Sequence, residues 1–482
     1  MGVYRDLGRD FDEWFDWIVR EAEIYDYGRY PVKGMGVWLP YGFKIRKYVI
    51  ELMRDLLDST GHEEILLPIL IPDNILAKES EHVRGFEDQV YWVTHGGLTP
   101  LDVKLALRPT SETPLSYLES LWIKSYKQLP KKYYQVVSIF RYETAATRAM
   151  IRVREVTTFK EAHTLHSTYE DSERQVAEAV EVYSTFFREL GIPFVISKRP
   201  EWDKFPGAIY TIAFDTLMPD GKTLQIGTVH NLGRSFTIAF NVWIHMPDGS
   251  MDFGWQTSYG ISERVIASLI SVHGDETGLR LPFKYAPVQV VIVPIPAGTE
   301  EVRKKVIELC GRVAEMLRAG GLRSVIDDRE DMTPGDKFYY WERRGVPIRI
   351  EIGPKELQEE SVTIVRRDTR SRSLVRISEL VEEVKKVGRE YDEAIKSEAL
   401  RGFASHVIKA SSIEEAEKAV SSGNIVELPW CGRVSCATEL EVRVGGKALG
   451  TPLKVDESVV MGLKCPLCGN EARTLMRYSR RY

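Results

Sequence analysis

The sequence predicts a multidomain protein of the α+β class, and three observations lead to this prediction. Its 482 residues correspond to about three domains of about 150 residues each. Strands alternate with helices beyond 281–287, which indicates a small α/β domain. Four strand-like runs precede that point, several without an intervening helix, which is typical of an antiparallel sheet: 133–142, 209–216, 222–229 and 235–244.

Hydrophobic spacing predicts the other elements of the first part. Apolar residues recur at helical intervals in four segments: 9–24, 43–58, 171–190 and 260–273. Between the second and third of these, the run HEEILLPILIP (62–72) reads as a buried strand that Pro68 and Pro72 interrupt.

We expect three domains, over 1–283, 284–382 and 383–482. In the second, VQVVIVPI, RSVIDD, PIRIEIG and SVTIVRR read as strands, with helices at 299–319 and 335–344. A long charged helical segment from 377 to about 410 leads into the third, a small α/β domain.

Composition excludes some classes of protein. Hydrophobic residues make up 43% and charged residues 28%, a globular balance that excludes a largely disordered chain. No apolar run approaches the about 20 residues that a membrane span needs, and the N-terminus does not read as a signal peptide. A cytoplasmic protein without a membrane partner is therefore expected.

Charge is uneven along the chain. The net charge of −5 gives no sign of a nucleic-acid partner and by itself favours an enzyme of small metabolites. Locally, however, residues 363–376 hold five arginines against one aspartate. Such a run is either a solvated face or a surface that contacts phosphates.

Four of the five cysteines lie close together near the C-terminus. Cys431 and Cys436 are separated by four residues, and Cys465 and Cys468 by two, a pattern typical of loops that hold tetrahedral zinc. Four thiolates close the coordination shell, so the predicted Zn²⁺ site is structural. The alternative is four unlinked thiols. Cys310 stands alone in a helical pattern and is expected in the core.

Arginines cluster after a predicted strand. FRYE (140–143) is followed by a loop that bears Arg148, Arg152 and Arg154. Buried arginines need anionic partners, which are either nearby glutamates or phosphates, whose oxygens suit the guanidinium fork. Upstream, LRPTSETP (107–114) places a threonine and a glutamate two residues apart, a weak signal by itself.

Two further segments carry polar residues at special places. TLQIGTVHNLGRSF (223–236) puts Gln225, Thr228 and His230 along a strand, although a lone histidine is more often structural. In GWQTSYGISERVIASLI (254–270), Arg264 occupies the first turn of a helix, where the dipole disfavours a cation unless an anion is near.

In order and spacing, these patches resemble the motifs of class II aminoacyl-tRNA synthetases, and the resemblance extends over the whole chain. The helix and strand that end at Pro68 look like motif 1, FRYE with its arginine loop like motif 2, and GISERVIASLI like motif 3. The TSE loop with QIGTVHNLG is similar to prolyl-tRNA synthetases of the archaeal and eukaryote-like type.

The resemblance implies a catalytic domain with an antiparallel sheet, an anticodon-binding α/β domain and a zinc-binding C-terminal domain. It also implies ligation of L-proline to tRNA(Pro) with ATP and Mg²⁺ through a prolyl-adenylate, and a homodimer formed through motif 1. Only about 100 residues separate His163 from Arg264, too few for an editing insertion, so no internal editing domain is expected.

The resemblance also assigns roles in the proline site. It implies that Thr110 and Glu112 hold the substrate ammonium and that His230 lines the pocket. Arg141 would bind the carboxylate or the α-phosphate. Trp202, Phe205 and Gly207 would wall the pyrrolidine ring, although an aromatic cluster is usually core.

For ATP and tRNA, the resemblance implies a second set of roles. Glu143 would contact adenine, Arg152 and Arg264 the outer phosphates, and Gln225, Thr228 and Ser262 the remainder of ATP with its magnesium. Three residues are candidates for reading anticodon guanines, although a solvated surface explains each nearly as well: Glu342, Arg349 and Lys355. One departure concerns adenine, because Val156 occupies the place of the usual stacking Phe and Phe159 is the possible substitute.

Other readings fit less well. A seryl enzyme would need a long N-terminal coiled coil, and a threonyl enzyme would need a cysteine ligand in the catalytic region, which holds no cysteine. A non-catalytic tRNA-binding module would not be expected to keep Glu112, Arg141 and Arg264. A zinc-dependent metabolic enzyme would need an open metal position.

Overall fold

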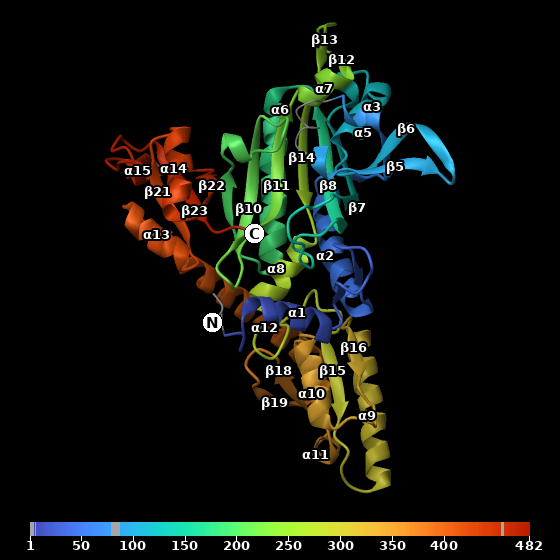
Figure 1. The fold of residues 1–482 in the computed structure, drawn as a ribbon. Helices are drawn as coiled ribbons and strands as arrows, with labels where there is room; N and C mark the ends of the chain where they lie inside the picture. Colours follow the sequence, from blue (N-terminus) through green and yellow to red (C-terminus); the bar gives the residue numbers. More distant parts are fainter. Residues whose placement is uncertain (1–3, 5, 79–86, 455–456) are drawn as a thin grey trace.

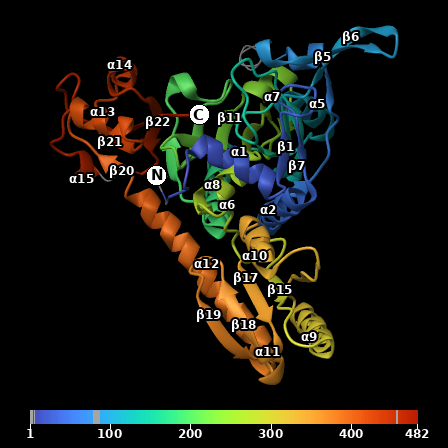
Figure 2. The ribbon, with the colours of Figure 1, turned by 60° about the horizontal axis from the view of Figure 1, so that its bottom comes forward.

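The computed structural model describes residues 4, 6–78, 87–454 and 457–482. In Figure 1 a large sheet with its helices forms the upper body, a five-stranded unit lies below it and a C-terminal unit lies beside it. Figure 2 shows α12 (Leu380–Ala404) running from the five-stranded unit to the C-terminal unit. The predicted α+β class, an antiparallel sheet followed by α/β units, is confirmed.

Seven strands of the first part form most of the large sheet. Each pairs antiparallel with its neighbour, apart from the parallel pair at the β3 edge. In spatial order they are β3 (Glu63–Glu64), β7 (Lys131–Phe140), β8 (Glu155–His166), β14 (Trp255–Ile261), β11 (Thr223–Gly233), β10 (Tyr210–Leu217) and β9 (Val195–Lys198).

Helices cover one face of this sheet and share its largest core. The predicted helices correspond to α1 (Phe11–Glu21), α2 (Pro40–Ser59), α6 (Tyr169–Leu190) and α8 (Arg264–His273). Phe186 and Phe187 of α6 are fully buried, and the ring of Phe187 packs against Phe214 of β10. α6 ends at Gly191 with φ of 67°, a left-handed conformation that glycine adopts without strain.

Two predicted strands are wrong. Residues 235–244 form α7 (Ser235–Phe240) and the short β12 (Trp243–His245), because Phe236, Thr237 and Phe240 bury one helical face and Asn241 ends the helix in the left-handed region. Residues 62–72 form only β3 and β4 (Leu70–Pro72), and the side chain between them at Leu66 is 79% exposed. Pro68 interrupts pairing there, since proline lacks the N–H a ladder needs.

A hairpin projects from the body at the side of β7 and β8 (Figure 1). It consists of β5 (Tyr91–Gly96) and β6 (Thr99–Leu107), and β4 pairs with β6 at its base. The remaining small elements of this part are β1 (Tyr25–Tyr27), β2 (Gly36–Trp38), α3 (Asp73–Leu76), η1 (Glu87–Gln89), α5 (Glu112–Trp122), η2 (Tyr126–Gln128), η3 (Glu201–Asp203) and β13 (Met251–Phe253).

The five-stranded unit has the predicted alternation of strands and helices. Its first three strands in space are parallel and the last two antiparallel, with their own core. The strands in spatial order are β16 (Ser324–Ile326), β15 (Val290–Pro294), β17 (Ile348–Ile352), β18 (Ser361–Arg366) and β19 (Arg372–Arg376), with helices α9 (Glu300–Ala319), α10 (Pro334–Arg343), α11 (Pro354–Gln358) and η4 (Ile377–Glu379).

The C-terminal unit extends the large sheet. β22 pairs with β9 through Thr451 and Pro452, so that eleven strands form one sheet. Gly450 permits this approach, because a Cβ there would lie 2.1 Å from the Lys198 carbonyl oxygen. The elements are β20 (Val407–Lys409), α13 (Ile413–Ser421), β21 (Ile425–Trp430), α14 (Val434–Val444), β22 (Lys447–Pro452), α15 (Glu457–Val460) and β23 (Thr474–Ser479).

Within the described part of the chain, no helix combines the length and the apolar character needed to cross a membrane.

Candidate functional site

A cavity of about 370 Å³ opens on the face of the large sheet opposite α6. Its wall is formed by β8, β11, β14 and the loops that precede α5 and α8. It brings together eleven of the residues singled out from the sequence: Thr110, Glu112, Arg141, Glu143, Arg152, Phe205, Gln225, Thr228, His230, Ser262 and Arg264.

The strand pleat explains which residues of β8 reach the cavity. Side chains alternate between the two faces of a strand, so Phe159 and Glu161 line the cavity. Lys160 points to the other face, where it is fully buried and its Nζ donates to the Tyr183 hydroxyl at 2.8 Å.

A buried carboxylate lies at one end of the cavity. Glu112, at the start of α5, is 4% exposed. Its Oε2 accepts a hydrogen bond of 2.5 Å from the Thr110 hydroxyl, and its Oε1 accepts one of 2.9 Å from Ser258 of β14. These bonds fix the orientation of an anionic group that faces the cavity, which suits it to bind a small cation.

A second carboxylate, Glu161, lies beside the first and was missed in the sequence. It accepts hydrogen bonds from the Ser111 hydroxyl at 2.5 Å and from Gln135 at 2.7 Å, and lies 3.3 Å from His163 Nε2. Burial acts to raise its pKa, but His163, Ser111 and Gln135 outweigh burial and bring the pKa to about 2. The signal in the sequence was FKEAH (159–163), which places Glu161 and His163 two residues apart and therefore on the same face of a strand.

Arginines occupy the other end. Arg264, at the start of α8, donates from Nε to the Ile151 carbonyl at 2.8 Å. Burial, followed by the charges of Arg141 and Arg152, lowers its pKa to about 10, and Arg481 acts in the same direction. Cations held this close repel one another, so a bound polyanion would be stabilised here.

Arg141 extends from the end of β7 between the two ends of the cavity. Its Nε and Nη2 donate to the Pro109 carbonyl at 3.2 and 3.1 Å, and its guanidinium carbon lies 5.9 Å from the Phe159 ring centroid. Burial lowers its pKa, although Glu112 and Glu143 oppose the shift. Val156 and Phe159 both line the cavity, so an aromatic ring is present despite Val156.

An uncharged wall closes the cavity beside Glu112. His230 of β11 bonds to Thr211 through Nδ1 at 2.8 Å, and its ring centroid lies 4.6 Å from that of Phe205. Burial lowers the pKa of His230 to about 4, so this imidazole is neutral at pH 7. Trp202 was expected in the same wall, but it lies on η3 with 40% of its surface exposed. Asp203, Lys204 and Phe205 line the cavity, and neither Trp202 nor Gly207 does.

The C-terminal tail reaches the cavity, a point that the sequence left open. Arg481 lines the cavity and its Nη1 lies 2.7 Å from Asp203 Oδ2. The next residue, Tyr482, donates from its backbone N to the Thr223 carbonyl at 3.2 Å and from its hydroxyl to Asp220 at 2.7 Å.

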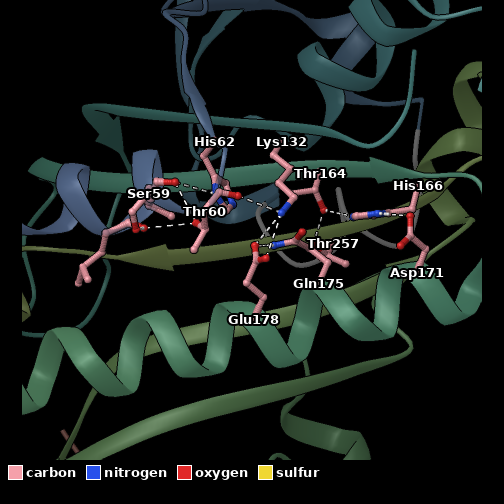
Figure 3. A network of polar contacts seen from close by, with 12 residues as sticks. Ser59, Thr60, His62, Lys132, Thr164, His166, Asp171, Gln175, Glu178 and Thr257 are labelled. Carbon is pink, nitrogen blue, oxygen red and sulfur yellow. Dashed lines mark hydrogen bonds and ion pairs between the residues drawn. The ribbon is translucent and has the colours of Figure 1, made fainter. Parts of the chain in front are cut away.

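A polar network supports β8 from behind (Figure 3). Lys132 of β7 forms an ion pair of 2.8 Å with Glu178 of α6. Thr164 and His166 of β8 share a 2.8 Å hydrogen bond, and His166 Nδ1 lies 3.1 Å from Asp171 Oδ2. These contacts join the strand to α6 and restrain the sheet that carries the cavity.

The four cysteines of the C-terminal unit converge as the sequence predicts. The sulfurs of Cys431, Cys436, Cys465 and Cys468 all lie within 4.8 Å of one another. Tetrahedral zinc with Zn–S bonds of about 2.3 Å needs sulfurs about 3.8 Å apart, so the cluster is compatible with Zn²⁺. Asn470 Nδ2 donates to the Cys468 sulfur at 3.3 Å, the kind of outer contact that orients a thiolate ligand.

The three candidates for guanine recognition lie in the five-stranded unit. Arg349 of β17 donates to Glu342 of α10 at 3.0 Å and to Glu351 at 3.0 Å. Its guanidinium carbon lies 3.8 Å from the Phe338 ring centroid. Lys355 is exposed on α11, on the same unit.

Comparison with known proteins gives the family. The class II tRNA synthetase core domain (G, H, P, S and T) matches 91–273, an anticodon-binding domain matches 289–387, and the prolyl-tRNA synthetase C-terminal domain matches 413–482. The proline–tRNA ligase of Aeropyrum pernix is 59% identical over 98% of both chains, and that of Sulfurisphaera tokodaii 57% over the same shares. The chain belongs to the prolyl-tRNA synthetase family.

Solved structures of prolyl-tRNA synthetases match the whole chain. The Giardia lamblia enzyme, solved with prolyl-adenylate, has a TM-score of 0.95 and 35% identity, and covers 100% of both chains. The Cryptosporidium parvum enzyme, solved with halofuginone and AMPPNP, has a TM-score of 0.92 and 31% identity, and covers 100% of this chain and 99% of its own. The large-sheet unit is therefore a class II synthetase core, and the five-stranded unit is an anticodon-binding domain through which the chain binds tRNA.

Proposed function

We propose that the chain joins L-proline to tRNA(Pro) through a prolyl-adenylate, with the cavity on the large sheet as its active site. The observation that carries the proposal is the polarity of that cavity. Glu112 and Glu161 lie at one end, and Arg152 and Arg264 at the other, which matches the ammonium of an amino acid and the phosphates of ATP. Domain boundaries at 1–283, 284–382 and 383–482 are part of the proposal.

In the first step, a proline carboxylate oxygen attacks the α-phosphorus of ATP, a P–O bond forms, and the bond to the β-phosphate oxygen breaks to release pyrophosphate. Glu112 with Thr110 holds the secondary ammonium, while His230 and Phe205 enclose the ring. Arg141 binds the reacting carboxylate and α-phosphate. No protein nucleophile is needed, because positioning and cationic stabilisation lower the barrier.

ATP extends from Arg141 to the arginine end. Arg152 and Arg264 bind the outer phosphates, Glu143 contacts adenine, Phe159 packs on it, and Ser262 lies beside Arg264. In the second step, the terminal ribose hydroxyl of tRNA attacks the prolyl carbonyl and AMP leaves.

Two metals complete the proposal. Mg²⁺ would bind together with ATP and would neutralise phosphate charge. Because Mg²⁺ keeps several of its waters, it would need few ligands from the protein. Gln225 and Thr228 supply oxygens at the cavity wall, and Gln225 Oε1 is already fixed by Arg199 at 2.9 Å. Zn²⁺ would be held by the four cysteines and supply folding energy only. As a translation enzyme, the protein is expected in the cytoplasm.

The decisive experiment is ATP–pyrophosphate exchange with single amino acids in the absence of tRNA. Exchange that is strongest with proline supports both the formation of a prolyl-adenylate and the assignment of the cavity as the proline pocket. Absence of exchange with every amino acid, while tRNA still binds, would favour a non-catalytic tRNA-binding module.

We also propose that no internal editing domain is present. In the synthetase core, the elements between β8 and β14 are α6, β9, η3, β10, β11, α7, β12 and β13. They belong to the large sheet, to its helices or to the short β12–β13 pair, and none forms a domain of its own. A pocket for proline cannot strongly reject alanine, since a methylene is worth only about 1–3 kcal/mol. Purified protein is expected to leave Ala-tRNA(Pro) intact, and release of alanine faster than in buffer would contradict this.

A homodimer is the final part of the proposal. Large apolar side chains are exposed beside motif 1, in the turn of the β5–β6 hairpin and on α5, with exposed fractions of 79% at Leu66, 99% at Leu98 and 56% at Leu121. We infer that part of this apolar surface is covered in a dimer. Sedimentation is expected to give twice the chain mass of 55.1 kDa. Leu66→Glu is expected to shift the protein towards monomer, whereas a wild-type monomer at micromolar concentration would contradict the assignment.

A further inference from the structure

One buried ion pair joins the anticodon-binding domain to the synthetase core. Arg367 follows β18, and only 2% of its side chain is exposed. Its Nη1 donates to Asp275 Oδ2 and its Nη2 to Asp275 Oδ1, both at 2.7 Å. Burial opposes both charges, yet the contact raises the pKa of Arg367 and lowers that of Asp275. A bidentate pair of this kind fixes the orientation of both groups.

On the core side, the pair connects to α8. Asp275 follows the end of that helix, and its Oδ1 also accepts from Thr277 N and Gly278 N at 3.0 and 3.1 Å. Its carbonyl accepts from Trp14 Nε1 at 2.8 Å. Residues 265–273 of α8 are all buried, so the helix acts as a rigid rod, about 15 Å long, with Arg264 at its other end.

On the anticodon side, the same guanidinium connects to α10. Arg367 Nε donates to the Glu342 carbonyl at 3.2 Å. The side chain of Glu342 bonds to Arg349 at 3.0 Å, and both residues are candidates for guanine recognition. Glu342 therefore contacts Arg349 through its carboxylate and Arg367 through its backbone carbonyl.

Close backbone packing restrains the contact between the end of α10 and the segment that follows α8. A Cβ on Gly278 would lie 2.5 Å from Arg343 Cα, and one on Gly345 would lie 2.6 Å from Leu279 Cβ. Leu279 N donates to the Arg343 carbonyl at 3.1 Å. A shift at the end of α10 must therefore move the segment that follows α8.

We propose that Arg367 is a positioning residue that couples anticodon binding to the placement of Arg264 through Asp275 and α8. The inference rests on the proposed function. Binding of guanine to Glu342 and Arg349 shifts the position of the end of α10. The guanidinium of Arg367 transmits this shift to Asp275, and α8 transmits it to Arg264 in the ATP site. The proposed link corresponds to a coupling free energy between guanine binding in the anticodon-binding domain and ATP binding in the core.

Arg367→Lys tests the proposal, because lysine keeps the charge and loses the fork that grips Asp275 and Glu342 together. Charging would be measured with tRNA(Pro) and with a variant in which one anticodon guanine is replaced. The preference in kcat/KM for the native anticodon is expected to fall about tenfold, mainly in kcat, a typical size for coupling between sites. ATP–pyrophosphate exchange without tRNA is expected to stay within about twofold.

The matched control is Arg280→Lys. Arg280 is 6% exposed and its 3.0 Å ion pair links the core to Glu398 of α12. Among the described residues, none of its hydrogen bonds goes to Asp275 or Glu342. It should leave the anticodon preference unchanged. The proposal is overturned if Arg367→Lys keeps the full preference, if exchange and charging fall in parallel, or if the control lowers the preference equally. Failure of the proposed function itself would appear earlier, as wild-type protein without proline-dependent exchange.

Discussion

Replacing Arg264 by alanine is expected to lower ATP–pyrophosphate exchange with proline by about 10³-fold, and Arg141→Ala is expected to have a similar effect. Each guanidinium is buried where phosphate charge develops, and removing one such donor in a preorganised site typically costs about 10²–10³ in rate. Arg264 stabilises the outer phosphates and Arg141 the reacting centre. Both substitutions are therefore expected to lower kcat rather than to raise the KM for proline. Single-turnover formation of the adenylate measures the effect directly.

Neither change is expected to unfold the protein. Burial and the nearby charges of Arg141 and Arg152 lower the pKa of Arg264 to about 10, so its removal relieves repulsion even as the bond to the Ile151 carbonyl is lost. Arg174→Ala is the matched control, since Arg174 of α6 forms a 2.8 Å ion pair with Asp171 and 72% of its side chain is exposed. Exchange close to the wild-type rate in the two active-site variants would refute their roles.

Cys465→Ser is expected to release zinc and to destabilise the C-terminal domain by at least about 3 kcal/mol, a fraction of the about 10–16 kcal/mol that zinc supplies to isolated zinc-finger peptides. Cys465 is 1% exposed, so its loss leaves three thiolates around an incomplete shell. Because β23 and the tail that bears Arg481 belong to the same domain, exchange activity should fall as well. Metal content, thermal unfolding and activity are the measurements.

Cys310→Ser provides the control for loss of a thiol. Cys310 is fully buried in the anticodon-binding domain and lies apart from the cluster. This variant should retain one zinc per chain and full exchange. If Cys465→Ser retained stoichiometric zinc, or if wild-type protein held no zinc after purification without chelators, a structural zinc site would be ruled out.

Much of the fold was predictable because local patterns and tertiary structure agree. The alternation in 284–382 gave the five-stranded unit, and the apolar stripes gave α1, α2, α6 and α8 within a few residues. The two wrong strands have physical causes. The run 235–244 holds β-forming residues whose buried positions follow a helical period. In the run 62–72, Leu67 and Ile71 are buried, but Leu66, Ile69 and Leu70 are exposed, so its apolar character reflects surface as well as core.

The cavity was predictable in part. Residues within a motif, such as Thr110 with Glu112 or Arg141 with Glu143, were singled out because the motifs that hold them resemble those of class II synthetases. Glu161 was missed because a buried acid on a strand reads as an ordinary ion pair until its neighbours are known. Arg481 could not be placed at all, since 216 residues separate it from Arg264 and only the folded chain brings them together.

The continuous sheet has a consequence for how this chain tolerates shortening. Without the C-terminal domain, β9 would become an edge strand and expose a row of unpaired N–H and C=O groups, the kind of edge that invites pairing with other chains. The contact of Thr451 with Lys198 and the bond from Arg477 to the Ile196 carbonyl at 2.7 Å cover that edge. The C-terminal domain therefore also protects the core from aggregation. A core truncated before β20 would need another segment to cover β9 in order to stay soluble.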